Sequence, residues 1–185
     1  MREAPSDTDL VRRFRAGEGR AFEAIVDRYK RPLFVMLARM VGDRDAADDL
    51  LQECFVRLWR HIDGLDESEP LYGLLRRTAV NLGLNHLRGR ARRRTALESA
   101  AREMAEAPAD AEPEAGGAAE TSRAVREALA EMPGEQRACL VLRVQEELSY
   151  SEIARATGVA VGTVMSRLSR ARTALRERLK ARAVL

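Results

Sequence analysis

Hydroxyl and guanidinium groups recur along one predicted helix near the C-terminal end of the sequence. Ser166, Arg170 and Thr173 are separated by four and then three residues, so they lie on one helical face. Met165 and Arg167 flank that face. Because such side chains reach base edges and phosphates in a DNA major groove, the spacing indicates a nucleic-acid-binding helix.

A second polar stripe follows a predicted helix in the N-terminal half. Arg77 is followed at offsets of 4, 8 and 11 by Asn81, Asn85 and Arg88, which places all of them on one side of a helix. Asparagine hydrogen-bonds adenine edges, and arginine holds phosphates. Tyr72, just before the stripe, is an aromatic ring able to stack on an unpaired base. The competing interpretation is surface polarity for the stripe and helix packing for Tyr72.

The paired carboxylates Asp48 and Asp49 raise the question of acid–base catalysis. No nucleophile, metal ligand or positioned histidine stands near them, and the chain has no phosphate-binding glycine loop, zinc motif or catalytic triad pattern. Cys54 and Cys139 lie far apart in apolar surroundings, which favours buried free thiols in a reducing cytoplasm. We therefore expect no enzyme activity, no cofactor and no metal site.

A predicted helix-turn-helix over residues 149–173 positions the C-terminal polar face. Ser149 and Glu152 have the spacing of a capping box, and Gly158 stands where the turn requires a left-handed backbone. Small and apolar residues recur behind the polar face, namely Ala154, Val164, Leu168, Ala171 and Leu175. The whole pattern favours a DNA-binding helix-turn-helix over a helical hairpin with solvated arginines.

Helical periodicity also runs through the N-terminal half, where the alternation typical of strands is missing. We expect Pro32 to open a new helix. A helix over 46–62 is expected to bury Trp59 in the core, and a further helix runs from Leu71 into the arginine cluster at 88–94. These elements predict an all-α fold.

The distribution of charge divides the chain into three parts. The whole chain has 32 basic and 29 acidic residues, whereas residues 95–122 hold one arginine and seven acidic residues. That segment has few large apolar side chains, so we expect a flexible acidic linker. It joins two small helical domains, at residues 1–94 and 123–185. No apolar run is long enough to span a membrane, so we expect no membrane insertion.

Taken together, these motifs resemble those of bacterial sigma factors. Residues 129–137 and 152–172 resemble the promoter-binding C-terminal domain of that family. Residues 48–60 resemble the core of its N-terminal domain, and residues 75–81 and 85–88 resemble its promoter-melting helix. With these two domains alone, the chain is similar to the extracytoplasmic-function branch.

The resemblance implies a chain that binds the clamp and flap regions of core RNA polymerase, directs it to a promoter and helps to open the duplex. It assigns polymerase binding to Asp49, Gln52 and Glu53. From the residues alone, the competing interpretation is that these three belong to a solvated, charged helix face. The branch is usually silenced by an anti-sigma factor, so we expect such a partner.

The resemblance also divides the promoter-binding residues between double-stranded and single-stranded DNA. It implies minus-35 recognition by the helix that carries Arg170, with Thr163 as a phosphate contact. It implies minus-10 recognition by Tyr72 and the stripe that begins at Arg77. Two positions depart from the family, because Leu74 stands where tryptophan is usual, and Met165 stands where a basic residue is common.

The alternative function is a stand-alone helix-turn-helix repressor or activator. Such a protein needs a dimerisation surface to pair two half-sites, and the sequence shows no coiled-coil heptads or obvious apolar stripe for one. Binding of free duplex DNA without polymerase distinguishes the two functions. We expect the cytoplasm as the location in both cases.

Overall fold

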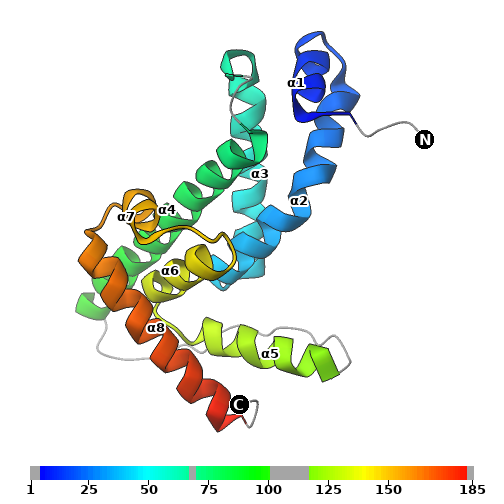
Figure 1. Ribbon diagram of the computed structural model, residues 1–185. Helices are drawn as coiled ribbons and strands as arrows, with labels where there is room; N and C mark the ends of the chain where they lie inside the picture. The colour runs from blue at the N-terminus through cyan, green and yellow to red at the C-terminus, as the bar shows by residue number, and fades with distance from the viewer. Residues whose placement is uncertain (1–4, 67–69, 101–116, 183–185) are drawn as a thin grey trace.

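The structure is a computed structural model that describes residues 5–66, 70–100 and 117–182. Every regular element within these residues is a helix, which confirms the all-α prediction (Figure 1). In chain order the elements are α1 (Asp7–Arg15), α2 (Gly19–Val41), α3 (Arg44–His61), a short 3-10 helix (Ile62–Gly64), α4 (Leu71–Ala100), α5 (Gly117–Ala130), α6 (Gly134–Val144), α7 (Tyr150–Thr157) and α8 (Val161–Ala181).

Helix boundaries follow the capping signals in the sequence. Ser6 caps α1 and Ser149 caps α7, and in each helix a carboxylate three residues later completes a capping box. The Asp43 side chain caps α3. Gly42 (φ 74°) and Gly158 (φ 68°) end α2 and α7 in the left-handed conformation that glycine adopts without strain.

The expectation of a new helix at Pro32 is wrong, because α2 is continuous over Gly19–Val41. Pro32 lacks the N–H that would bond to the carbonyl of Arg28, so the helix loses one hydrogen bond there. Both halves of α2 nevertheless bury apolar side chains, such as Ile25 before the proline and Leu37 after it. Tertiary packing of both halves therefore outweighs the local defect.

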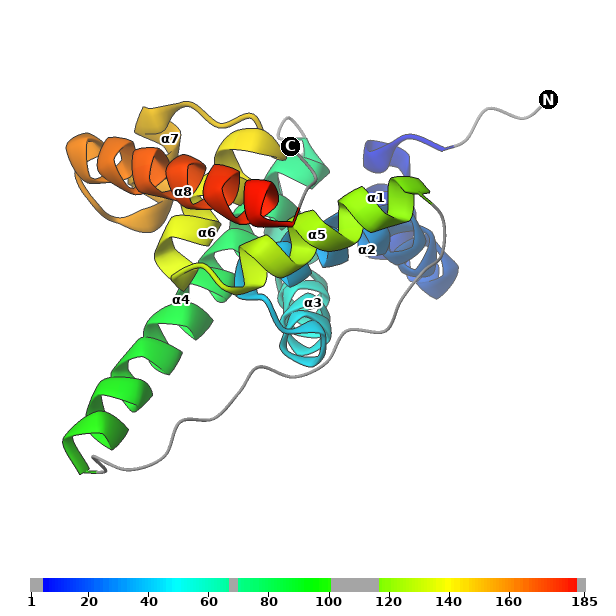
Figure 2. The ribbon, with the colours of Figure 1, turned by 90° about the horizontal axis from the view of Figure 1, so that it is seen from below.

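One hydrophobic core connects the two halves of the chain. α2 packs against α3 and α4, and also against α6 from the C-terminal half. Figures 1 and 2 both show α6 lying against α2 and α4. The same cluster of buried residues contains Leu33 and Leu75 from one half and Leu142, Ile153 and Leu168 from the other. The two helical units are therefore in apolar contact.

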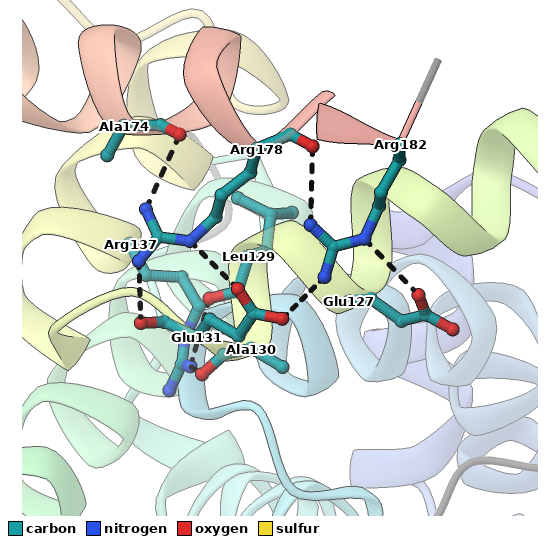
Figure 3. Close-up of polar contacts among 8 residues, drawn as sticks. All are labelled: Glu127, Leu129, Ala130, Glu131, Arg137, Ala174, Arg178 and Arg182. Atoms are coloured by element: carbon teal, nitrogen blue, oxygen red, sulfur yellow. Dashed lines mark hydrogen bonds and ion pairs between the residues drawn. The ribbon is translucent and has the colours of Figure 1, made fainter. Parts of the chain in front are cut away.

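Arg137 on α6 joins the ends of two other helices. It is buried, and it donates hydrogen bonds to the carbonyls of Met40 and Val41 in α2 and of Leu129 and Ala130 in α5 (Figure 3 shows the α5 side). The last carbonyls of a helix have no partner within it, so one guanidinium satisfies two helix ends. Burial lowers the pKa of Arg137 to about 10, and the side chain stays charged at neutral pH.

The helices reach into the segment expected to be the linker. α4 continues to Ala100 and α5 begins at Gly117, so both enter the range 95–122. Residues 101–116 lie outside the described residues. For them, the flexible acidic connection stays a prediction.

Candidate nucleic-acid and protein interfaces

α7 and α8 form the predicted helix-turn-helix, and α8 is held by its apolar side. Gly158 ends α7, and α8 begins at Val161 after an N-cap at Ala160. The inner side of α8 is fully buried at the anchoring positions Val164, Leu168 and Ala171. This packing determines which face of α8 points away from the protein.

The outer side of α8 exposes most of the residues predicted to contact duplex DNA. Met165, Ser166, Arg170 and Thr173 are exposed, and Thr163 is half-buried. The Ser166 hydroxyl donates to the Thr163 carbonyl at 2.9 Å, a local bond that a base edge can replace. The outer face thus presents hydroxyls, a cation and an apolar side chain to a major groove.

Arg167 points in a different direction from these residues. Its guanidinium pairs with Glu135 at the start of α6, and 19% of its side chain is exposed. With Arg88 of α4, the two residues line a small cavity between the halves of the chain. The structure therefore does not bring Arg167 to the outer face with Arg170.

Ion pairs tie the end of α8 to α5 (Figure 3). Arg178 pairs with Glu131 at 3.0 Å, and Arg182 pairs with both Glu131 and Glu127. The hydrogen bond from Arg182 is the main cause that lowers the pKa of Glu131. These two arginines are engaged within the protein, whereas Arg170, Arg172 and Arg176 of α8 are exposed.

The polar stripe of α4 lies on the surface. Arg77, Asn81, Asn85 and Arg88 are all exposed, as the helical spacing predicted. Arg88 also contacts the C-terminal half, because it donates to the carbonyl of Thr157 at the end of α7. One end of the stripe therefore already touches the helix-turn-helix.

Tyr72 is engaged at both its ring and its hydroxyl. The ring stacks on Tyr29 with the centroids 5.7 Å apart, and the hydroxyl donates to the Glu146 carboxylate at 3.4 Å. The Glu146 side chain is 4% exposed and lies 3.9 Å from Arg76. Burial raises the pKa of Tyr72 and of Glu146, and Arg76 opposes the rise for Glu146.

Sequence reasoning did not identify Glu146. It follows α6 in a turn, and it reaches Tyr72 across 74 residues of sequence. No local pattern reports such a contact. Its consequence is that a carboxylate from the C-terminal half holds the hydroxyl of the residue that was predicted to stack on a base, while Tyr29 already stacks on the ring.

The outer face of α3 carries the three residues predicted to bind polymerase. Asp49 and Gln52 are exposed, and the Gln52 amide donates to Asp48 at 2.8 Å. Glu53 is half-buried and pairs with Arg57 at 2.8 Å. All three can be reached by a partner.

Trp59 is not in the core, which corrects the sequence expectation. Its exposed fraction is 52%, and it packs against Phe14 and Phe22 with ring centroids 4.5 Å and 4.8 Å away. Val56, one turn earlier on α3, is also exposed. The helical period places Trp59 next to the core residues of α3, but its aromatic contacts hold it at the edge of the core. There Val56 and Trp59 form an apolar patch beside the acidic face of α3.

Cys54 and Cys139 are buried free thiols, as predicted. Burial raises the pKa of Cys54 to about 12, so this thiol is uncharged at neutral pH. Within the described ranges, no group of three or more His, Cys, Asp or Glu side chains is placed to hold a metal ion. No helix in those ranges has the length and apolar character needed to cross a membrane.

Comparison with known proteins agrees with this arrangement. The family model "Sigma-70 region 2" matches residues 25–93, and "Sigma-70, region 4" matches residues 122–175, which contain the helix-turn-helix. The chain therefore belongs to the sigma-70 family of RNA polymerase sigma factors. Within it, the chain belongs to the extracytoplasmic-function (ECF) branch.

Curated relatives match over nearly the full chain. Identity to the RNA polymerase sigma-H factor of Pseudomonas aeruginosa is 34% over 181 residues, covering 94% of each chain. Identity to the ECF RNA polymerase sigma-E factor of Escherichia coli K12 is 31% over 188 residues, covering 95% of each.

Two solved structures share the fold. CnrH, in complex with the cytosolic domain of CnrY, has a TM-score of 0.55 and 29% identity, covering 95% of this chain and 97% of that one. RpoE from Bartonella quintana, in complex with the anti-sigma factor NepR, has a TM-score of 0.57 and 24% identity, covering 86% of this chain and 96% of that one.

Proposed function

We propose that this protein directs core RNA polymerase to specific promoters and helps to open the DNA there, as a non-catalytic specificity subunit in the cytoplasm. The observation that carries the proposal is the helix-turn-helix, in which the inner face of α8 is buried and the outer face is open. Membership of the ECF branch supports it.

The outer face of α8 recognises the minus-35 element as duplex DNA. Arg170 and Ser166 are the candidates for base contacts, because both are exposed on the face that the buried Val164 and Leu168 turn outward. Thr173 lies further along the same face, and Thr163 near the helix start contacts phosphate. Arg167 holds α8 against Glu135 and supplies positive charge behind the face.

The polar stripe of α4 and Tyr72 recognise the minus-10 element as it opens. Asn81 and Asn85 offer amides to base edges, and Arg77 and Arg88 hold the phosphates. Extruding a base costs a few kcal/mol, so a ring that stacks on it compensates part of that cost. In the folded protein the ring of Tyr72 stacks on Tyr29 and its hydroxyl is bonded to Glu146, so a base exchanges with these contacts when it binds.

Promoter opening is therefore accompanied by separation of the two halves at α4. The contacts that separate are the Glu146 contacts with Tyr72 and Arg76 and the bond from Arg88 to Thr157. These contacts are polar, so a nucleic-acid strand of phosphates and base edges can replace them, whereas the apolar contacts of α4 with the C-terminal half, such as that of Leu87 with Gly134, are also lost on separation.

The outer face of α3 binds the polymerase clamp through Asp49, Gln52 and Glu53, and the C-terminal half binds the flap. The apolar patch at Val56 and Trp59 extends the α3 face. Removing its exposed apolar area from water favours a protein partner.

An anti-sigma factor is the proposed regulator. RpoE of Bartonella quintana is solved with the anti-sigma factor NepR, and CnrH is solved with the cytosolic domain of CnrY. A partner of this kind silences the protein by covering the faces that polymerase and promoter require.

Run-off transcription on fragmented genomic DNA tests the proposal. Core polymerase without sigma factor, this protein, and the two together are compared. Defined start sites in the combined reaction alone support a sigma factor. If the combined reaction yields no defined start sites while the protein alone shifts specific duplex fragments, the proposal fails and a stand-alone regulator takes its place.

A further inference from the structure

Two large apolar side chains are exposed one turn apart at the start of α8. Val161 is 43% exposed and Met165 is 54% exposed. Their spacing of four residues places them side by side on the helix. A partner that covers such side chains removes their apolar area from water, which stabilises the complex.

Their position on the helix indicates what covers them. In a helix-turn-helix, the N-terminal residues of the second helix contact base edges in the major groove. Met165 lies about 100° around the helix from the buried Val164, at the edge of the outer face, and Val161 is exposed in the first turn, where α8 begins. Ser166 and Arg170 lie exposed beside the apolar pair.

Gly162, between the two apolar residues, supports a close approach by a partner. A Cβ atom there would meet nothing within 4 Å. Glycine within a helix costs about 0.5–1 kcal/mol relative to alanine. The chain itself therefore has no need of a glycine at this place. The space that a Cβ atom would take is therefore open to a group that approaches from outside the protein.

We propose that Met165, with Val161, recognises thymine in the minus-35 element through its C5-methyl group. Thymine is the base that presents a methyl group in the major groove, and apolar side chains contact it there. Gly162 lets the first turn of α8 approach the sugar–phosphate backbone closely enough for this contact. The inference rests on the proposed function, because it assumes that α8 binds promoter duplex.

Replacing thymine with deoxyuridine tests this contact, because the two bases differ only in the methyl group. The template is a promoter mapped by run-off transcription, with each thymine of the minus-35 element replaced singly on either strand. Full-length protein with core polymerase is expected to lose about four-fold in initial transcription at one or two positions, the effect of one buried methyl group.

A variant of Met165 tests whether this residue is responsible for the deoxyuridine effect. With Met165→Ala, transcription falls on the thymine template, and the ratio between thymine and deoxyuridine templates falls to about one. The matched control is Val144→Ala, which trims an apolar residue that is 68% exposed on α6. It is expected to keep the four-fold ratio.

Each possible result bears directly on the methyl contact or on the proposed function. Mapped start sites without any deoxyuridine effect overturn the methyl contact and leave the proposed function standing. An undiminished deoxyuridine effect with Met165→Ala also overturns it, because another residue then reads the methyl group. If Met165→Ala lowers transcription equally on both templates, the ratio between them stays four-fold. Met165 is then assigned to a contact with a protein partner. Absence of start sites is the failure of the proposed function itself.

Discussion

The two DNA-binding faces differ in how the folded protein presents them. The outer face of α8 is open, with Arg170 and Met165 exposed. The face of α4 is open along its stripe, but Tyr72 is engaged, by Tyr29 at its ring and by Glu146 from the other half of the chain at its hydroxyl. A duplex can therefore meet α8 without rearrangement, whereas a base that stacks on Tyr72 has to displace existing contacts, and we propose that the halves separate there.

The difference follows from what fixes each face. α8 is fixed within its own half, by burial of Val164 and Leu168 and by the ion pairs of its last turns to α5. The covered face of α4 depends on contacts between halves. Arg137 is a buried polar link between them, because it reaches the carbonyls of Met40 and Val41 from α6.

Removing the link at Arg137 has the largest expected effect. Arg137→Met leaves the carbonyl groups at the ends of α2 and α5 without donors, and we expect the free energy of unfolding to fall by roughly 2–4 kcal/mol. Urea denaturation followed by circular dichroism measures it. The control, Arg172→Met at an exposed position of α8, is expected to change stability by less than about 0.5 kcal/mol. Equal effects of both would show that Arg137 does not join the halves.

Substitutions of two arginines test the open face of α8. Arg170→Ala removes an exposed cation, and we expect transcription at cognate promoters to fall about 10- to 100-fold with polymerase binding intact. Arg167→Ala removes the pair with Glu135 instead and is expected to cost only a few-fold. Run-off transcription and polymerase co-migration are measured together. If Arg170→Ala weakens polymerase binding to the same degree, Arg170 belongs to folding or to that interface.

The covered face of α4 is tested by the pH dependence of stability. Burial raises the pKa of Glu146 above 4.5, so the folded state holds this proton more tightly than the unfolded state. The stabilisation is present below the unfolded pKa and is lost as pH rises through the folded pKa. Relative to Glu146→Gln, the wild type should therefore lose thermal stability as pH rises above the usual range of a glutamate carboxyl.

The control for this experiment is the neighbouring Glu147→Gln, which alters an exposed carboxylate. Melting temperatures of the three proteins across the pH range give the comparison. Should the wild type gain stability relative to Glu146→Gln as pH rises, attraction to Arg76 outweighs burial, and Glu146 holds the halves together as an ion pair.

The smallest expected effect comes from Gly162 on α8, where one substitution should change stability and function in opposite directions. Gly162→Ala should raise the free energy of unfolding by about 0.5–1 kcal/mol, yet lower promoter-specific transcription several-fold. Gly19→Ala, at the start of α2, is the matched control, because a Cβ there also meets nothing within 4 Å. It should stabilise the protein without loss of transcription. Full activity of Gly162→Ala would show that no DNA backbone comes close to this turn.

The parts of the fold that local signals control could be predicted from the sequence. The capping box at Ser149, the left-handed turn at Gly158 and the buried face that contains Val164 all follow from short-range spacing. The prediction that a helix starts at Pro32 was wrong, because tertiary packing on both sides of the proline outweighs one missing hydrogen bond.

The contacts that cover or redirect site residues could not be predicted. Tyr72 and Glu146 are 74 residues apart, and Arg167 reaches Glu135 across 32 residues. A stripe on a helical wheel shows which residues share a face, but it does not show what a distant segment places on that face. The sequence therefore predicts which groups are candidates for DNA contact, and the tertiary structure adds which of those groups are already engaged.

Site-directed photo-crosslinking in the holoenzyme tests the difference between the two faces most directly. A photo-reactive amino acid is placed at Thr173 on α8 or at Asn81 on α4, and the crosslinked promoter bases are mapped. We predict that position 173 crosslinks to the minus-35 duplex, and that position 81 crosslinks to the minus-10 element only when polymerase opens the DNA. Crosslinks from both positions to the same duplex segment without polymerase would contradict the account.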